Sequence, residues 1–137
     1  MGRNKTSGVG LPGTEIVNPG GLSDDVVRAH VRIFREANAA IRDLQSAMEG
    51  YIAGSDASRA AREAAVDAGN WRERDRILTE RQKERDKVTT LLLKAQSVIA
   101  RDFAFSIENN SPIPEKRREV YRQVLEFARD YKITTGD

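Results

Sequence analysis

The 137-residue chain has no cysteine, only one histidine and few aromatic residues, which make up 6% of it. Without cysteine there can be no disulfide, no thiolate metal site and no cysteine nucleophile. The single histidine, His30, rules out sites that need two, including the Glu-x-x-His pairs of di-metal helical bundles. These absences remove most of the familiar catalytic and metal-binding arrangements.

Long apolar runs and blocks of one charge sign are also missing. No stretch approaches the 18 apolar residues of a membrane span, and no apolar segment lies near the start as in a signal peptide. The net charge is +2, from 23 basic and 21 acidic residues spread along the chain. Nothing in this balance requires nucleic acid or an anionic membrane. We expect a location in the cytoplasm or within a virion or other intracellular assembly.

Glycine and proline are concentrated at the start. Residues 1–21 hold six of the ten glycines and two of the four prolines. This composition predicts an extended arm without its own core, which we expect to lie along a neighbouring subunit. The letters of Gly8–Gly13 match the dinucleotide fingerprint, but a preceding strand and a helix opening on the glycines are missing. We therefore expect no cofactor.

The rest of the chain reads as helix. Capping and breaking residues predict helices over about 23–53, 56–68, 71–108 and 114–132, in one domain over 22–137. Ser23 suits a helix start, Gly54 and Gly69 suit helix ends, and Asn70 can cap the helix after it. The expected fold is all-α, an elongated helical bundle or hairpin around the long central helix. One unbroken helix from Asp56 through the central helix is an alternative, since a mid-helix glycine costs only about 1 kcal/mol.

Two helices carry strong apolar periodicity. In the first, apolar positions and His30 alternate spacings of three and four, a coiled-coil seam: Val27, His30, Phe34, Ala37, Ile41, Leu44, Met48 and Tyr51. In the central helix, one face is predicted to hold Val88, Leu91, Leu92, Ala95, Val98, Ile99, Phe103 and Ile107. In the first helix a second row recurs every seven residues: Val26, Ile33, Ala40 and Ala47. Its apolar face is therefore broader than a two-stranded coiled coil needs, which indicates packing against two helices at once.

No set of residues predicts catalysis. A Ser–His–Asp triad would have to use His30, whose position on the seam favours a structural or register role. No acidic residue is expected on an apolar face, so a carboxylate with a raised pKa has no support from the pattern. We expect a protein that is not an enzyme and has no catalytic, cofactor or metal site.

The first half of the central helix is the densest in charge. Twelve of the 17 residues from Trp71 to Lys87 are charged, and candidate phosphate contacts are Arg72, Arg74, Arg76, Arg81 and Lys83. Five acidic residues interleave with them, which argues against a continuous phosphate-binding stripe. Trp71 is expected to plug a local core. A second basic cluster comprises Arg117, Arg118, Arg122 and Arg129.

The segment from Ala60 to Leu93 combines a small-residue helix, the Gly69-Asn70-Trp71 turn and a charged helix. It resembles the helical hairpins of tetratricopeptide units and of phage small terminase subunits, and assigns no family.

The sequence predicts a non-catalytic assembly protein, a homo-oligomer within a larger complex of phage or bacterial type. The residues expected to mediate self-association are Val27, Phe34, Ile41, Leu44, Met48, Tyr51, Leu92, Ile99 and Phe103. The alternative is a nucleic-acid-binding accessory subunit, such as a small-terminase-like packaging or recognition protein.

Overall fold

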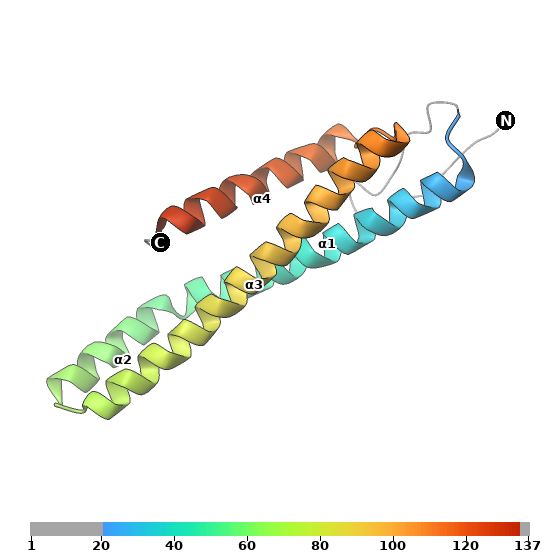
Figure 1. The fold of residues 1–137 in the computed structure, drawn as a ribbon. Coiled ribbons are helices and arrows are strands. Elements are labelled where there is room, and N and C mark those ends of the chain that lie inside the picture. Colours follow the sequence, from blue (N-terminus) through green and yellow to red (C-terminus); the bar gives the residue numbers. More distant parts are fainter. Residues whose placement is uncertain (1–20, 135–137) are drawn as a thin grey trace. The chain divides into compact units, whose positions relative to one another are not determined.

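A computed structural model describes residues 21–134 of the chain as four helices (Figure 1): α1 (Asp24–Ala53), α2 (Ser55–Asp67), α3 (Trp71–Asn109) and α4 (Glu115–Thr134). Within these residues there is no strand, and no helix is long and apolar enough to cross a membrane. The all-α prediction is confirmed, and each predicted helix end lies within two residues of the observed one. The predicted arm over 1–21, with Gly8–Gly13, lies outside the described residues except for residue 21.

Capping side chains explain where α1 and α3 begin. Ser23 Oγ accepts a hydrogen bond from Val26 N at 3.2 Å, and Asn70 Oδ1 accepts one from Glu73 N at 3.1 Å. Gly69 has a φ of 70°, and Asn70 N donates to Ala65 O at 2.8 Å. This is the glycine-based helix end expected from the sequence. Separate helices α2 and α3 are therefore correct, and the unbroken helix from Asp56 is wrong.

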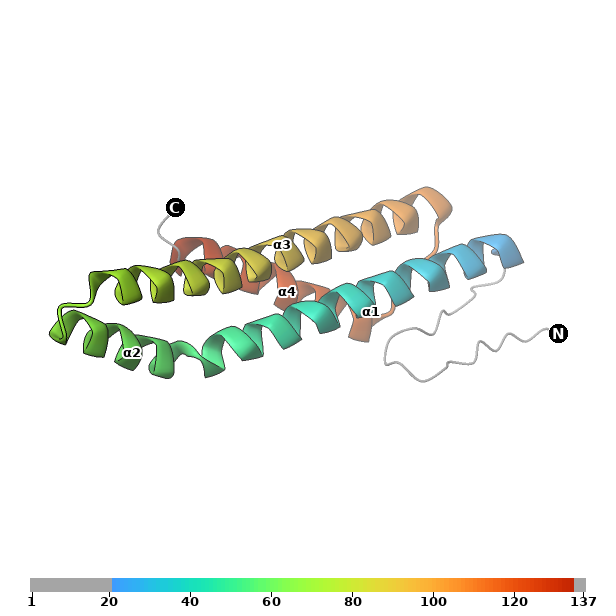
Figure 2. The same cartoon turned by 90° about the horizontal axis from the view of Figure 1, so that it is seen from below.

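α1 ends at Ala53, as predicted, and Gly54 forms a bend between α1 and α2 rather than a full break. It keeps a helical backbone, with φ −86° and ψ −2°. Its N–H donates to Gly50 O at 3.1 Å, and its carbonyl accepts from Ser58 N at 2.9 Å, so helical hydrogen bonding continues from α1 into α2. Figure 2 shows that the chain changes direction between α1 and α2. A Cβ atom on Gly54 would lie 3.4 Å from Nη1 of Arg81, which is an ordinary van der Waals contact.

The structure groups the chain into two units, and the single domain predicted over 22–137 stays a prediction. Unit 1 comprises Met1–Ile41 and Lys94–Asp137, of which residues 21–41 and 94–134 are described. Unit 2 comprises Arg42–Leu93.

Unit 1 is a three-helix core built from α1, α3 and α4. Its buried apolar side chains come from all three helices and from the α3–α4 connection: Phe34, Ala37, Ala40, Ile41, Ala95, Val98, Ile99, Ile113, Tyr121, Val124 and Ala128. The predicted face of α3 is wrong at its end. Phe103 is 36% exposed and Ile107 is 82% exposed, whereas Asp102 is fully buried. The buried face therefore continues from Ile99 to Asp102, at the next spacing of three.

Unit 2 is a helical hairpin in which α2 and the last turns of α1 lie along the first part of α3 (Figure 2). Its buried apolar side chains are Leu44, Ala65, Ile77, Val88 and Leu92. Only two helical layers pack here, so each helix has just one neighbouring surface within the unit to pack against. The core of unit 2 is correspondingly thin.

Candidate functional site

The most unusual feature of unit 1 is a hydrogen-bonded chain of polar side chains inside its core. Nε2 of His30 lies 2.5 Å from Oδ1 of Asp102, and the Tyr121 hydroxyl donates to Oδ2 of the same carboxylate at 2.5 Å. Nδ1 of His30 lies 2.7 Å from Oγ of Ser111. All four side chains are 0% exposed. We call this set the buried histidine network; it links α1, α3, α4 and the connection between α3 and α4.

The hydrogen-bond partners determine where the protons lie. Asp102 as a carboxylate can only accept, so Nε2 of His30 carries a proton. In the neutral imidazole, Nδ1 then accepts a hydrogen bond from the Ser111 hydroxyl. Each ring nitrogen therefore has a partner on a different segment, and the ring itself packs against Phe34 and Phe105 with centroids 4.3 and 4.8 Å away.

Arg117 adds a positive charge beside this network. Its side chain is almost fully buried, donates to Asn38 Oδ1 and lies over the rings of Phe34 and Tyr121, at 5.0 and 5.4 Å. Burial lowers the pKa of Arg117, while the negative charge of the nearby Asp102 carboxylate acts in the opposite direction. Asp102 therefore provides negative charge near the buried guanidinium as well as accepting two hydrogen bonds.

His30 lies within hydrogen-bonding distance of both Ser111 and Asp102, as the base does in a nucleophile–base–orienter arrangement. The surroundings argue against that chemistry, because Ser111 Oγ must meet a substrate and the residue is 0% exposed. The network instead satisfies buried polar groups in a core, which is costly to disturb. The structural role predicted for His30 fits this arrangement.

Asp102 and Ser111 were not predicted from the sequence as members of a site. The expectation that no acidic residue lies on an apolar face is wrong, because Asp102 continues the buried spacing of Leu92, Ala95 and Ile99. That spacing was the available signal. Ser111 had no signal in the sequence, because its position depends on the turn that ends α3. In this turn Asn110 adopts a φ of 52°, and Ser111 N donates to Ser106 O at 3.0 Å.

The environment of Tyr121 makes the free energy of unfolding fall as the pH rises above about 10. Burial, followed by the hydrogen bond to Asp102 and the charge of that carboxylate, raises the pKa of Tyr121 well above its ordinary value near 10. Above pH 10 the unfolded chain loses this proton while the folded chain keeps it. The contribution to stability is therefore present in full below pH 10 and is lost as pH rises, by up to about 1.4 kcal/mol per pH unit.

We expect Tyr121→Phe to remove this alkaline dependence. At neutral pH the variant should lose about 1.5–3 kcal/mol of unfolding free energy, since the hydrogen bond to a carboxylate is lost. Between pH 10 and 11.5 its stability should fall less steeply than that of the wild type. Urea unfolding at several pH values checks this, and equal slopes for the two proteins would refute it.

The residues predicted to mediate self-association occupy two environments. Phe34, Ile41, Leu44, Leu92 and Ile99 are buried in the chain's own core, so their burial needs no second copy. Val27, Met48 and Tyr51 are half-buried, and Phe103 is exposed. Self-association itself stays a prediction, and the side chains available for it are those that the fold leaves exposed.

Most of the basic residues proposed to contact phosphates have acidic partners on their own helix. Arg74 binds Asp75 at 2.8 Å, Arg76 binds Glu73 at 2.7 Å, and Lys83 lies 3.8 Å from Glu80. Arg81 binds Glu84 at 3.0 Å, and Arg72 is exposed. The ion pairs hold down the pKa of Glu73 and raise that of Arg76, in each case chiefly through their mutual hydrogen bond. The positive charge available for phosphate is therefore reduced.

Arg81 has a structural role in unit 2. Its Nη1 donates to the Tyr51 carbonyl at 2.9 Å, next to the bend at Gly54, and its guanidinium lies 3.9 Å from the centre of the Tyr51 ring. Arg81 thereby links α3 to the end of α1.

We expect Arg81→Lys to lower unfolding stability by about 1 kcal/mol, because lysine keeps the charge but not the flat stacking and forked donors. Thermal unfolding measures the loss. The control is Arg72→Lys at an exposed position, for which we expect a change within about 0.5 kcal/mol. Equal behaviour of the two variants would contradict the role assigned to Arg81.

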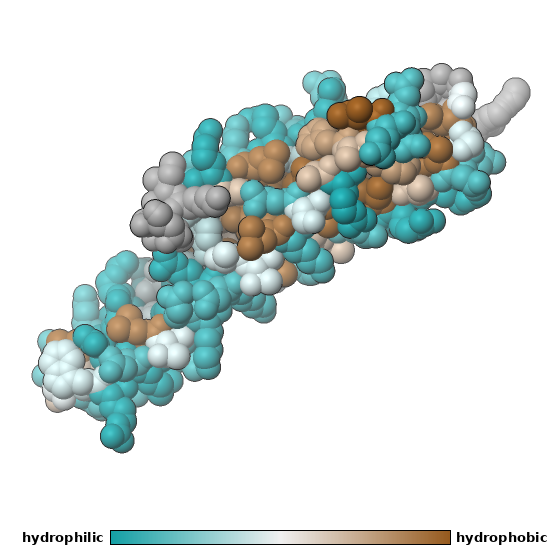
Figure 3. All heavy atoms as spheres, viewed as in Figure 1, coloured by the Kyte–Doolittle hydropathy of each residue, from teal (hydrophilic) through white to brown (hydrophobic). Residues whose placement is uncertain are grey.

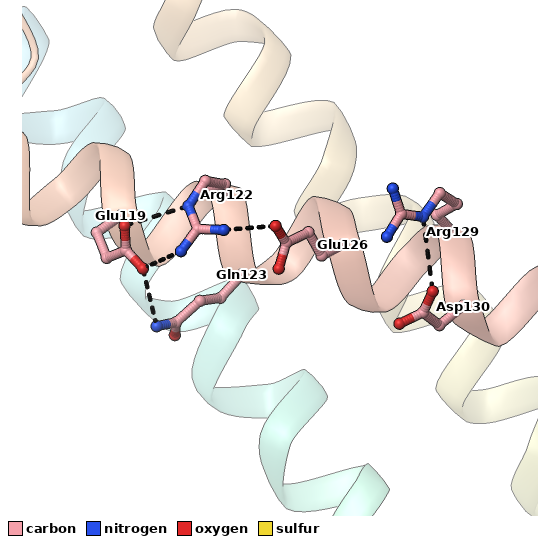
Figure 4. A network of polar contacts seen from close by, with 6 residues as sticks. All are labelled: Glu119, Arg122, Gln123, Glu126, Arg129 and Asp130. Atoms are coloured by element: carbon pink, nitrogen blue, oxygen red, sulfur yellow. Dashed lines mark hydrogen bonds and ion pairs between the residues drawn. The ribbon is translucent and has the colours of Figure 1, made fainter.

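The second basic cluster, on α4, is divided between the core and paired surface charges. Arg117 is buried. Arg122 bonds to both Glu119 and Glu126, and Arg129 lies 3.5 Å from Asp130 (Figure 4). The hydrogen bond with Arg122 lowers the pKa of Glu119 and raises that of Arg122. Exposed pairs of this kind contribute little stability, and here they offset the basic charge of α4.

The end of the hairpin in unit 2 exposes apolar side chains. We call this surface the hairpin end; it comprises Val66 on α2 with Trp71 and Leu78 on α3, and Trp71 is 55% exposed. The prediction that Trp71 plugs a local core is wrong. An open hollow of about 310 Å³ lies beside it, lined by Arg62, Glu63, Val66, Asp67, Arg74 and Leu78. Figure 3 shows brown apolar atoms among teal ones where α2 meets α3.

Ligand-binding chemistry is sparse in the described part of the chain. No group of three or more histidine, cysteine, aspartate or glutamate side chains among residues 21–134 could hold a metal ion. A second hollow in unit 2, of about 420 Å³, lies between α1 and α3 and carries charges of both signs from Asp43, Glu84 and Lys87. Glu84 already pairs with Arg81 there. The hairpin end is therefore the better candidate for a functional surface.

No protein-family model, curated protein or solved structure matches the chain.

Proposed function

We propose that the protein is a non-catalytic assembly subunit that binds protein partners, including copies of itself, by helix–helix packing. The observation that carries this proposal is the balance of apolar side chains in unit 2. Five are buried, one of them an alanine, while five large ones are exposed: Ile52, Val66, Trp71, Leu78 and Leu93. A two-layer hairpin that leaves this much apolar surface outside gains stability when further helices cover it.

The chemistry of unit 1 supports the same proposal. Its one serine–histidine–aspartate arrangement is sealed in the core, where it orders three helices and reaches no substrate. Unit 1 then contributes to the stability of the subunit.

The competing proposal is a nucleic-acid-binding accessory subunit of the small-terminase-like kind. It rests on the seven basic residues between Arg72 and Lys87. It has less support, because Arg74, Arg76, Arg81 and Lys83 already pair with acidic neighbours. Binding to phosphates would have to compete with these pairs.

Sedimentation velocity over a wide range of protein concentration tests the assembly proposal. We expect the mean mass to rise above 15.3 kDa as concentration increases, with less sensitivity to salt than DNA binding would show, because the contact is mainly apolar. A monomer at every concentration would refute self-association. The same samples mixed with a DNA duplex at low salt test the competing proposal, which requires binding that weakens in Arg72→Ala and as salt rises.

A further inference from the structure

We propose that the hairpin end is a self-complementary contact, in which Trp71 of each copy inserts into the hollow between Val66 and Leu78 of the other. This inference rests on the proposed function and names the surface and the partner. The partner is a second copy of this chain.

The hairpin end holds both an exposed aromatic ring and a hollow with apolar sides. Trp71, Arg74 and Leu78 recur at spacings of three and four, so they share one face of α3. Trp71 and Leu78 are seven residues apart, which is about 10 Å along the helix. Val66 contributes the facing wall of the hollow from α2. In a two-fold contact each residue meets its counterpart in reverse, so a projection and a hollow on one face can both be filled.

The charges around the hollow suit a second copy of the chain. Arg62 and Arg74 line it together with Glu63 and Asp67, so the rim carries equal numbers of positive and negative groups. A strongly acidic or basic partner would meet like charges on such a rim. A second copy related by a two-fold axis can place Arg62 opposite Asp67, and Asp67 opposite Arg62.

The exposure of Trp71 also favours a role in binding. A tryptophan that is 55% exposed leaves a large apolar surface in water, and tryptophan is enriched among the residues that dominate binding energy at interfaces. Arg74 covers one side of the ring, with its guanidinium carbon 5.3 Å from the ring centroid, and so holds the indole in a defined position. A preordered aromatic side chain loses less conformational freedom on binding.

The chain supplies its own reporter, because Trp71 is its only tryptophan. On dilution of the full-length protein, we expect the tryptophan emission to shift to longer wavelength and acrylamide quenching to increase. The midpoint of both changes should match the midpoint of dissociation measured by sedimentation. A protein that associates while the fluorescence of Trp71 stays constant would overturn the inference.

Substitutions provide the decisive test, with mass in solution as the readout. Trp71→Ser should weaken self-association by about 10- to 100-fold, as expected for loss of a central interface aromatic. The matched control is Ile107→Ser, which removes an even more exposed apolar side chain from unit 1 and should leave association unchanged. Arg62→Asp should also weaken association, and adding Asp67→Arg in the same chain should restore it.

The outcomes separate this inference from the proposed function. If Trp71→Ser associates as tightly as the wild type, or if the double charge variant fails to recover, the hairpin-end contact is wrong while assembly through another surface stands. If the wild type is monomeric at every concentration, both proposals fail. Circular dichroism of each variant verifies that the helices are intact.

Discussion

Asp102→Ala is expected to lower the free energy of unfolding by about 3–5 kcal/mol, the usual cost of removing one partner from a buried charged set. The substitution removes the acceptor of two hydrogen bonds, from His30 and from Tyr121. It also takes a negative charge away from the neighbourhood of buried Arg117. The donors that remain are fully enclosed, so water cannot replace the lost carboxylate without opening the core.

Urea unfolding followed by circular dichroism measures this loss. The control is Asp86→Ala, which removes an exposed carboxylate from the same helix and should change stability by no more than about 0.5 kcal/mol. The loss of stability for Asp102→Asn should lie between those of the other two variants. The amide keeps one oxygen acceptor, but its NH2 group adds a donor facing the donors of His30 and Tyr121. If Asp102→Ala costs no more than Asp86→Ala, the buried histidine network does not hold unit 1 together.

Phe34→Ala is expected to destabilise the fold by about 3–5 kcal/mol, because it removes a fully buried aromatic side chain and leaves a cavity. Phe34 packs against the His30 ring and lies beneath the Arg117 guanidinium. Its loss therefore affects both the apolar core and the polar network beside it.

This variant also distinguishes two roles for Phe34. A core residue lowers unfolding stability by the same amount at every protein concentration, whereas an interface residue lowers it only where copies associate. We expect the first behaviour, measured by urea unfolding at two protein concentrations a hundredfold apart. The exposed apolar control, Ile107→Ala, should leave stability within about 0.5 kcal/mol of the wild type.

The helices of this fold could be predicted because their signals are local. Ser23, Gly69 and Asn70 cap or end helices through neighbours within five residues, and the structure shows the expected bonds. The spacing of apolar residues in α1 placed Phe34, Ile41 and Leu44 on one apolar face, which was predicted to mediate self-association, and all three are buried. Their partner could not be read from the spacing alone, and the structure shows it to be the rest of the same chain.

The buried histidine network could not be predicted because its partners are distant in sequence. His30 is 72 residues from Asp102 and 81 from Ser111. A pattern of apolar residues does not identify a polar residue on a buried face, so Phe103 was predicted to be buried and its neighbour Asp102 was not. Trp71 was misplaced for a related reason: its size favours burial on average, but the short hairpin offers no third helix to cover it.

The turn that ends α3 also has a consequence for protein engineering. Asn110 and Pro112 lie on either side of Ser111, and the left-handed backbone of Asn110 sets the direction in which this serine leaves the helix. One extra amino acid in this connection would carry the hydroxyl away from the imidazole. Tags, insertions and new chain termini between Asn109 and Pro114 are therefore expected to disrupt the buried histidine network.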